Sequence, residues 1–477
     1  MQDHVITDKR KQNHLIALVS VTVFMFSIDY SMLNISLPVM ADFFKVNIRL
    51  VSRLPLAYLL VVTSTVLLFG KLGDILSFRK IFIAGLAIFI SGTFLCGLAP
   101  NLNVLLGFRI FQCIGEAMFS PMGIAMITTF LPDSAKGRGL GLMATAQGIG
   151  FCLGPIVGGF INDHMGWHNI FFVNIPLGLL AIMASFHVLP SKQPVPESRR
   201  IDIVGAILVF ISLSTLIFGL NSIAKLGLKN NIVISCLAVS IAAAVIFVIW
   251  EKRISYPVLD LSLFRNMDFT FATVSALCTI FVYMGLMFLM PFYLSMVRKM
   301  NIMDAGFLLM IPAFMLIIFA PLAGKLSDKT SARLICSIGI GLTTLAFLAF
   351  SLLTPQAHIS RLIPSLMLAG AAIGFFLPAN NKLVMAHAPS DKQGMASGVY
   401  KILVSTGGVF GIAILPLVLM SRLNKTIVLY HVDIAAARHS PEILITGFNA
   451  AFQFAMFVCL VGLLTAVLAK DKKGMAI

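Results

Sequence analysis

Apolar runs of about twenty residues recur along almost the whole of this 477-residue chain. A helix of about 20 residues crosses the hydrocarbon core of a bilayer, so runs of this length predict membrane-spanning segments. In lipid, only helices and closed barrels satisfy all backbone hydrogen bonds, and the strands of a barrel would show alternating polarity. The continuous apolar runs therefore predict helices. The predicted spans are 15–40, 50–70, 81–99, 103–130, 139–161, 170–189, 203–220, 232–250, 269–294, 303–323, 334–353, 362–386, 394–420 and 445–469.

The composition agrees with a lipid environment. Hydrophobic residues make up 59% of the chain and charged residues only 11%, whereas soluble domains are about 25% charged. All seven cysteines fall inside apolar runs, which does not fit a disulfide framework. The nine histidines show no metal-ligand spacing. We therefore expect neither a metal nor a cofactor.

The distribution of basic residues predicts the topology. A net charge of +16 would suggest nucleic acid in a soluble protein, but here the bases lie in short segments between spans. The segments on the N-terminal side carry 21 Lys and Arg, and those on the other side carry 11. Cytoplasmic loops are the more basic, so both termini are expected in the cytoplasm. The first span is too long for a signal-peptide core and is expected to be retained.

A short repeat divides the chain into two halves. Gly-Lys-Leu-Gly-Asp at 70–74 and Gly-Lys-Leu-Ser-Asp at 324–328 each end the second span of a six-span set. The predicted fold is an all-α integral membrane protein with 14 transmembrane helices, arranged as two pseudo-symmetric six-helix bundles plus two linker helices. Such an architecture places a binding site near the midplane between the bundles and works by alternating access. The predicted parts are a cytoplasmic tail (1–14), the first bundle (15–189), a linker with helices seven and eight (190–267), the second bundle (268–469) and a tail (470–477).

Two acidic residues lie deep inside predicted spans, Asp29 in the first and Glu116 in the fourth. Arg109 precedes Glu116 by two helical turns and faces nearly the same way. A charge at the bilayer centre costs at least about 2.5–3.5 kcal/mol, so these side chains are seldom idle. Asp29 and Arg109 could form a structural ion pair. Alternatively, the carboxyls could load and release protons, with Arg109 modulating them and Gln112 bridging or meeting substrate.

Two further stretches have both a structural and a functional interpretation. The fifth span contains glycines at spacing four and a proline, which predicts close helix packing and a bend; the residues are Gly150, Gly154, Pro155, Gly158 and Gly159. The segment after the second span could act as a gate or be an ordinary basic loop. The gate candidates are Gly70, Asp74, Arg79, Lys80, Gly324 and Asp328.

Polar and aromatic residues inside spans are candidates for lining a substrate cavity, although such residues also often serve packing. The candidates are Tyr30, Asn34, Tyr58, Gln112, Gln147, Tyr283 and Asn380.

These residues resemble the major facilitator superfamily, specifically its fourteen-helix drug:proton antiporter branch, over essentially the whole chain. The similar stretches are Asp29-x4-Asn34-x2-Leu37-Pro38, Gly70-x-Leu72-x-Asp74 with Arg79-Lys80, Arg109-x2-Gln112 with Gly115, Gly150-x3-Gly154-Pro155-x2-Gly158-Gly159, Trp167 to Gly178, and Pro257 with Leu263-Phe264-Arg265-Asn266. In that branch the fourth-helix Arg is linked with proton coupling, and the fifth-helix motif marks exporters.

The chain departs from the family pattern at several positions. Arg53 replaces a usual Trp, Ile75 a common base, Ser77 a Gly, Cys113 a Gly and Glu116 a small residue. The changes at 75 and 77 put the charge relay of the loop in doubt. Glu116 would add a second proton site or an attraction for cationic substrates. No acidic residue lies inside the predicted spans of the second half, so coupling is expected in the first half.

The resemblance implies a proton-coupled exporter of lipophilic or cationic drug-like compounds in the bacterial inner membrane, with Asp29, Glu116 and Arg109 in proton coupling. Its partners would be a small-molecule substrate, protons and the bilayer, without nucleic acid, and the protein would be a monomer. A narrow exporter or flippase for one metabolite, antibiotic or lipid is the alternative. A membrane-embedded enzyme or a proton-channel subunit fits less well, because no catalytic cluster lies near one interface and the second half has few ionisable residues.

Overall fold

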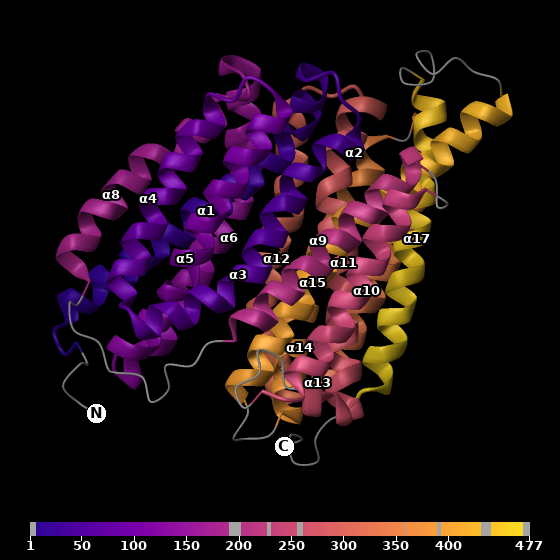
Figure 1. The fold of residues 1–477 in the computed structure, drawn as a ribbon. Helices are drawn as coiled ribbons and strands as arrows, with labels where there is room; N and C mark the ends of the chain where they lie inside the picture. Colours follow the sequence, from indigo (N-terminus) through magenta and orange to yellow (C-terminus); the bar gives the residue numbers. More distant parts are fainter. Residues whose placement is uncertain are drawn as a thin grey trace. The chain divides into compact units, whose positions relative to one another are not determined.

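The structure is a computed structural model and describes residues 6–189, 202–226, 230–254, 261–356, 358–388, 393–430 and 440–470. The regular elements in this part of the chain are all helical (Figure 1). The helices are α1 (Lys9–Phe43), α2 (Ile48–Val51), α3 (Arg53–Ile75), α4 (Phe78–Gly97), α5 (Leu102–Phe130), α6 (Asp133–Met165), α7 (Asn169–Phe172), α8 (Asn174–Val188), α9 (Ile203–Leu226), α10 (Asn231–Glu251), η1 (Leu261–Arg265), α11 (Met267–Phe292), η2 (Tyr293–Val297), α12 (Ile302–Lys329), α13 (Ala332–Ser351), α14 (Ile359–His387), α15 (Gln393–Tyr430) and α17 (Pro441–Leu468).

Thirteen of the described helices are long and apolar enough to cross a membrane. The segment Ile203–Gly219 of α9 is a shorter apolar helix at the position of the predicted seventh span. The predicted all-α, multi-span fold class is therefore confirmed. Side chains cap several of these helices: Asn101 accepts from the Val104 amide at the start of α5, and Ser331 accepts from the Leu334 amide at the start of α13. These caps satisfy amides that the first helical turn leaves without a partner.

Two compact units divide the chain, Met1–Val46 with Arg53–Phe210 and Asn47–Ser52 with Ile211–Ile477. Within the first unit, α1 packs on α6 and α8, and α5 packs on α3 and α4. Within the second unit, α11 packs on α15 and α17, and α14 packs on α12 and α13. The same ranks of helix are paired in both units, as expected for an internal repeat.

One pair of glycines shows that the repeat extends beyond the two short motifs. Gly85 and Gly339 are 254 residues apart, which is also the distance from Gly70 to Gly324. A methyl group on Gly85 would meet the Gly115 carbonyl of α5 at 2.7 Å, and one on Gly339 would meet the Phe376 amide of α14 at 2.9 Å. Gly85 thus lets α4 approach α5, and Gly339 lets α13 approach α14.

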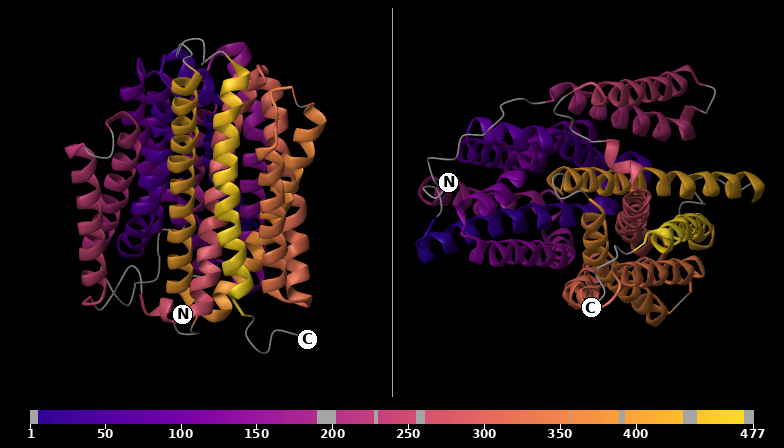
Figure 2. Two further views of the ribbon diagram at one scale, coloured as in Figure 1. Left: turned by 90° about the vertical axis from the view of Figure 1, so that its right-hand side faces the viewer. Right: turned by 90° about the horizontal axis from the view of Figure 1, so that it is seen from below.

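Helices α9 and α10 run side by side and are joined by two hydrogen bonds (Figure 2). The Ser212 hydroxyl donates to the Ser240 carbonyl at 3.1 Å, and the Ser240 hydroxyl donates to the Ser212 carbonyl at 2.9 Å. Most other α10 side chains are exposed or half-buried, including Ile241, which is 64% exposed. An apolar helix with this exposure is suited to lipid rather than water.

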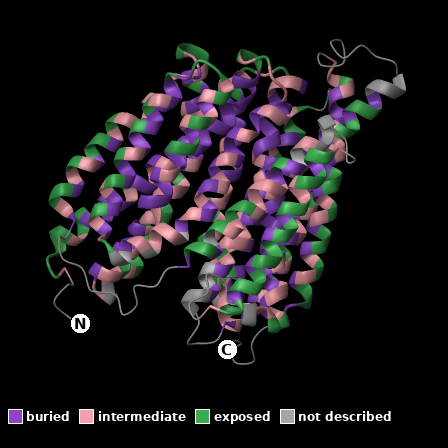
Figure 3. Cartoon of the chain, viewed as in Figure 1, coloured by how far each residue is buried: buried purple, intermediate pink, exposed green. Residues whose placement is uncertain are grey.

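Exposed apolar residues also follow the outer face of α8, where Figure 3 shows green and pink along the helix. Leu180, Met183 and Phe186 are 58%, 55% and 54% exposed. Opposite them, Gly178, Ala181 and Ser185 are buried. The helix therefore has one face for lipid and one for its own unit.

Some predicted boundaries change in the structure. The short motifs at 70–74 and 324–328 lie on the last turns of α3 and α12, because both helices run beyond the apolar stretch. The predicted sixth span divides into α7 and α8. Most of the linker 190–202, Pro257, nearly all of the tail 470–477 and the side chains of Asp74 and Asp328 lie outside the described residues.

Candidate functional site

A buried ion pair joins α1 and α5 within the first unit. The Arg109 Nη1 atom lies 2.6 Å from the Asp29 Oδ2 atom, and the two side chains are 0% and 2% exposed. Asp29 is near the middle of α1, so the carboxylate enters the unit far from both helix ends. Removing one partner of such a pair would leave a buried charge uncompensated.

Two amide side chains complete the set of donors around Asp29. The Gln112 Nε2 atom donates to Asp29 Oδ1 at 3.2 Å, and the Asn174 Nδ2 atom of α8 donates to the same oxygen at 3.3 Å. Gln112 also donates to the Thr93 hydroxyl of α4 at 2.7 Å and accepts from Arg109. Side chains of α5 and α8 therefore meet the α1 carboxylate directly, and α4 joins the network through Gln112.

Aromatic rings cover the other side of Arg109. The guanidinium carbon lies 4.9 Å from the centre of the Tyr58 ring, a cation–π distance. Tyr58 in turn contacts Tyr30, with ring centres 5.1 Å apart, and Tyr30 meets Phe151 of α6 edge-on at 6.3 Å. Tyr58 also lies close to the side chain of Glu116.

Glu116 is therefore close to the ion pair but has different surroundings. Its side chain is buried on α5, 3% exposed, beside Tyr58 and Cys113. The Arg109 Nε and Nη2 atoms make no hydrogen bond with any described residue. The site thus holds one carboxylate bound by a cation and amides, and a second carboxyl beside a phenol ring.

The glycines of α6 pack on the part of α1 that carries Asp29. A methyl group on Gly150 would meet Ser27 Cβ at 2.8 Å, and one on Gly154 would meet Ser31 Cβ and Oγ. The Ser31 hydroxyl donates to the Phe151 carbonyl at 3.1 Å, which links the two helices directly. The predicted close packing at this motif is therefore seen for Gly150 and Gly154.

The structure brings together some of the predicted cavity residues and not others. Tyr30, Asn34, Tyr58 and Gln112 are buried in the first unit, and Gln147 is half-buried on α6. Tyr283 is half-buried on α11 and Asn380 is fully buried on α14, both in the second unit. The Asn380 Nδ2 atom donates to the Ala272 carbonyl and the Ser275 hydroxyl of α11, at 2.9 and 3.1 Å.

The predicted gate residues differ in what they contact. Arg79 Nη2 donates to the Phe186 carbonyl at 2.9 Å and so holds the last turn of α8. Lys80 is exposed. A methyl group on Gly70 would lie 3.8 Å from Pro121, and one on Gly324 would meet no atom within 4 Å. In the second unit, the Lys382 Nζ atom donates to the Ser327 carbonyl near the end of α12 at 2.6 Å.

Comparison with known proteins decides the family. The sequence profile of the Major Facilitator Superfamily matches residues 19–412. The chain belongs to this superfamily. It is therefore a multi-pass membrane transporter of small molecules rather than an enzyme.

Several bacterial transporters are similar in sequence to this superfamily member. The riboflavin transporter RibZ of Clostridioides difficile is 33% identical over 383 residues, which cover 80% of this chain and 82% of that protein. The multidrug resistance protein Stp of Mycobacterium tuberculosis is 27% identical, with 85% and 75% covered. The tetracenomycin C resistance and export protein of Streptomyces glaucescens is 25% identical, with 85% and 76% covered.

Solved structures support the same fold. A bacterial homolog of the human lysosomal transporter Spinster, in an inward-facing conformation, has a TM-score of 0.70 at 14% identity and covers 97% of both chains. A POT family transporter in complex with a thioalcohol-conjugated peptide also has a TM-score of 0.70, at 15% identity and the same coverage. At these identities the likeness concerns the fold alone.

Sequence reasoning missed two residues of the transporter's Asp29 cluster. Asn174 lies at the start of α8, inside the stretch from Trp167 to Gly178 that resembles the family, and a polar amide at the head of an apolar helix was a usable signal. Thr93 gave no such signal. Its hydroxyl also bonds the Phe89 carbonyl of its own helix, as threonines in membrane helices commonly do.

Proposed function

We propose that this transporter is a proton-coupled exporter of amphipathic, lipophilic or cationic organic molecules in the bacterial inner membrane, with both termini in the cytoplasm. The observation that carries the proposal is the buried Asp29–Arg109 pair with Glu116 beside it in the first unit. Buried ionisable residues at this depth are typical of proton relays in transporters. The similarity to a multidrug resistance protein and to an antibiotic exporter supports the direction of transport.

In the proposed mechanism, the proton is taken up by Asp29. Its Oδ2 atom accepts from Arg109, and its Oδ1 atom accepts from Gln112 and Asn174. In the proposed step, a proton takes the place of the Arg109 N–H at Oδ2, so Nη1 moves away from that oxygen as the proton binds. The neutral acid can keep the two amide donors on Oδ1, which lets Asp29 change its charge without losing its position.

Glu116 and the tyrosines define the proposed substrate chemistry. Tyr30, Tyr58 and Phe151 offer aromatic faces, and Glu116 lies against one of them. Aromatic rings beside a carboxylate attract planar organic cations through stacking, cation–π and charge interactions. A substrate that pairs with Glu116 would compete with a proton for the same carboxyl, which would couple the two.

A second candidate function is a narrow carrier for one planar metabolite. It is favoured by the 33% identity to a riboflavin transporter, which is above the identity to the drug exporters described. Aromatic side chains suit a flavin-like ring as well as a drug. Under this alternative, the same Asp29 cluster would drive transport, but only one chemical class would be moved.

The test uses purified protein in liposomes with a pH gradient. Wild-type protein is expected to move a cationic dye against its gradient, and Asp29→Asn is expected to abolish this uphill movement while the protein remains folded. Asp42→Asn is the matched control, because Asp42 is an exposed residue at the end of the same helix. Uphill transport by Asp29→Asn at the wild-type rate would exclude Asp29 as the proton carrier.

A substrate panel in the same liposomes separates the two candidates. Transport of several unrelated dyes supports the broad exporter. Transport of riboflavin alone supports the narrow carrier.

A further inference from the structure

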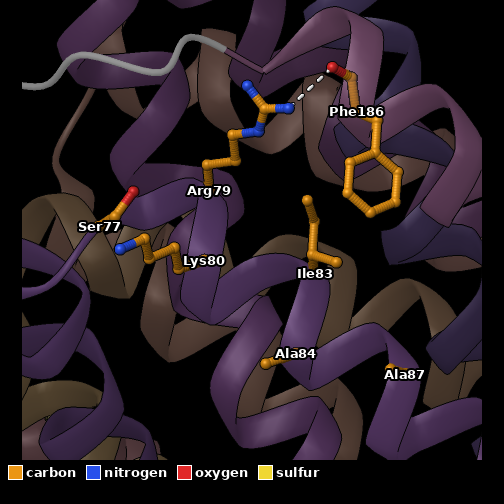
Figure 4. A pocket seen from close by; sticks show the side chains of 7 residues that line it. All are labelled: Ser77, Arg79, Lys80, Ile83, Ala84, Ala87 and Phe186. Carbon is orange, nitrogen blue, oxygen red and sulfur yellow. Dashed lines mark hydrogen bonds between the residues drawn. The ribbon is translucent and has the colours of Figure 1, made fainter.

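A groove lies on the first unit where α4 begins and α8 ends (Figure 4). Its volume is about 500 Å³. It is separate from the Asp29 cluster, since the two share no residue. The lining residues are Ser77, Arg79, Lys80, Ile83, Ala84, Ala87 and Phe186.

Small side chains form the apolar part of this groove. Ala84 and Ala87 are one turn apart on the exposed face of α4, where larger side chains would fill the space. Phe186 of α8 is 54% exposed and lines the groove with them. Both helices turn apolar exposed faces outward, so this part of the groove is suited to a hydrocarbon chain from the surrounding lipid.

One end of the groove is strongly basic. The Arg79 guanidinium is fixed there by its bonds to the carbonyls of Phe186 and Leu189. Lys80 is exposed and makes no hydrogen bond or ion pair with a described residue. Figure 4 shows the Lys80 amine and the Ser77 hydroxyl at the same edge of the groove.

Among the described residues that line the groove, the charged ones are basic. None of the lining residues is acidic, and the first turn of α4 contains no acidic residue. The Ser77 hydroxyl makes no capping bond to α4, and its O–H can donate to a bound anion. The positive end of the α4 helix dipole adds to the field of the two basic side chains.

We propose that this groove binds one anionic phospholipid from the cytoplasmic leaflet. The lipid phosphate accepts from Lys80 and Ser77, with Arg79 adding to the positive field, and one acyl chain lies along Ala84 and Ala87 against Phe186. The groove combines a basic end with an apolar channel, which is the complement of an anionic head group and its chain. The choice of leaflet rests on the cytoplasmic position proposed for the termini, because the residues before α4 then face the cytoplasm.

The test measures lipid retention by native mass spectrometry of the full-length protein, without substrate or a proton gradient. Phosphatidylglycerol is compared with phosphatidylcholine of the same acyl chains. Wild-type protein is expected to retain phosphatidylglycerol about fivefold or more tightly, as expected for one or two basic residues near a lipid head group. Because transport is not measured, the outcome is independent of the proposed function.

Two variants locate the site. Lys80→Gln is expected to weaken phosphatidylglycerol binding about fivefold and to leave phosphatidylcholine unchanged. Ala87→Phe fills the channel and is expected to weaken the binding of both lipids. The controls are Lys252→Gln and Ala238→Phe, which change exposed residues on or beside α10, away from the groove.

Three results would overturn the proposal. Equal affinity of wild-type protein for the two lipids would remove head-group recognition. Unchanged phosphatidylglycerol binding in both groove variants would place the lipid elsewhere. Competition by millimolar inorganic phosphate would show a site for a free anion instead. If Ala87→Phe does not fold, judged by thermal unfolding, Ala84→Leu narrows the same channel with a smaller change.

Discussion

The two units pair their helices in the same way but fill their centres with different chemistry. In the first unit, Arg109 of α5 reaches across to the Asp29 carboxylate of α1. In the second unit, Asn380 of α14 reaches across to a carbonyl and a hydroxyl of α11. The buried polar side chains described in α11 to α17 are serines, threonines and Asn380. The contact between the first and fourth helices of each six-helix set thus contains an ion pair in one set and neutral hydrogen bonds in the other.

This difference indicates that the residues that allow the helices to pack are not the residues that carry the proposed function. Close packing needs small residues, and both units supply them. Gly85 lies between α4 and α5, and Gly339 lies between α13 and α14. Charge is not needed for this helix contact, since α14 meets α11 through the neutral side chain of Asn380. The ion pair of the first unit therefore calls for another explanation, and the proposed proton coupling provides one.

The largest effect is expected from breaking the ion pair. Arg109→Gln leaves the Asp29 carboxylate buried without its cation and should lower the free energy of unfolding by about 3–5 kcal/mol. Asn380→Leu, in the second unit, removes only neutral hydrogen bonds and should cost about 0.6–2 kcal/mol. Denaturant unfolding of both variants in the same lipid environment measures the difference.

The double variant Asp29→Asn with Arg109→Gln sharpens this result. Because both charges are removed together, stability should recover most of the loss seen with Arg109→Gln, whereas uphill transport should stay absent. A double variant as unstable as Arg109→Gln would mean that the ion pair is not the cause. A double variant that still transports uphill would mean that the pair is only a brace.

Glycine substitutions test whether the two units are packed with equal tolerance. A methyl group on Gly411 of α15 would collide with the Phe281 carbonyl of α11, which is backbone, so Gly411→Ala should cost about 1–3 kcal/mol. On Gly158 of α6, the nearest atom is the Ile35 Cγ2 methyl at 2.7 Å, and the nearest backbone atom is Met32 Cα at 3.1 Å. Gly158→Ala should therefore cost less, and thermal unfolding measures the order.

Gly324→Ala is the control for this series, because its methyl group would meet no atom within 4 Å. Its stability should equal or slightly exceed that of the wild type, since alanine is the better helix former. An equal loss in all three variants would argue against helix packing as the cause, because Gly324 has no neighbour for the methyl group to meet.

A smaller effect is expected from Glu116→Gln, which keeps the shape of the side chain and removes its charge. Transport of cationic substrates should fall roughly tenfold, a difference of about 1.4 kcal/mol in binding, while transport of neutral substrates should change little. Concentration series for one cationic and one neutral compound give the ratio. An unchanged ratio would show that Glu116 does not recognise substrate charge.

The smallest effect is expected outside the spans, at His168. Burial beside Trp167, with ring centres 3.7 Å apart, lowers the pKa of His168 below its usual 6.5. The unfolded chain therefore binds this proton more readily, and stability is lost as the pH falls through about 6.5. His168→Phe keeps the ring stack and should reduce the acid-induced fall of the unfolding temperature. A wild-type fall in that variant would assign it to other groups.

Much of the fold could be predicted from the sequence because lipid permits so few solutions. Every predicted span lies on helical residues, although the sixth is divided between α7 and α8, and α1 starts at Lys9 and α15 runs to Tyr430, beyond the apolar stretches. Helix ends outside lipid depend on caps and local packing, which apolar length does not encode.

The candidate site could be predicted only in part. Asp29 and Arg109 stood out because charges are rare in spans, and the structure places them in contact. Thr93 did not stand out, since nothing in its local sequence distinguishes a bond to Gln112 from the common bond to its own helix. Tyr283 and Asn380 have side-chain types typical of a cavity, but Asn380 bonds α11 instead, and such tertiary contacts have no local signature.

Arg109 makes its hydrogen bonds to Asp29 and Gln112 through a single nitrogen, and its other two nitrogens make none with the described residues. A planar guanidinium can hydrogen-bond a second anion through these two nitrogens before its bond to the first carboxylate breaks. When Arg109 exchanges one anionic partner for another, both anions can therefore be bound at once. The guanidinium does not have to be left without a counter-ion in the apolar interior. A lysine at this position has a single compact ammonium group and would have to break its bond to Asp29 before it bound a second anion. The exchange of partners would then be slower.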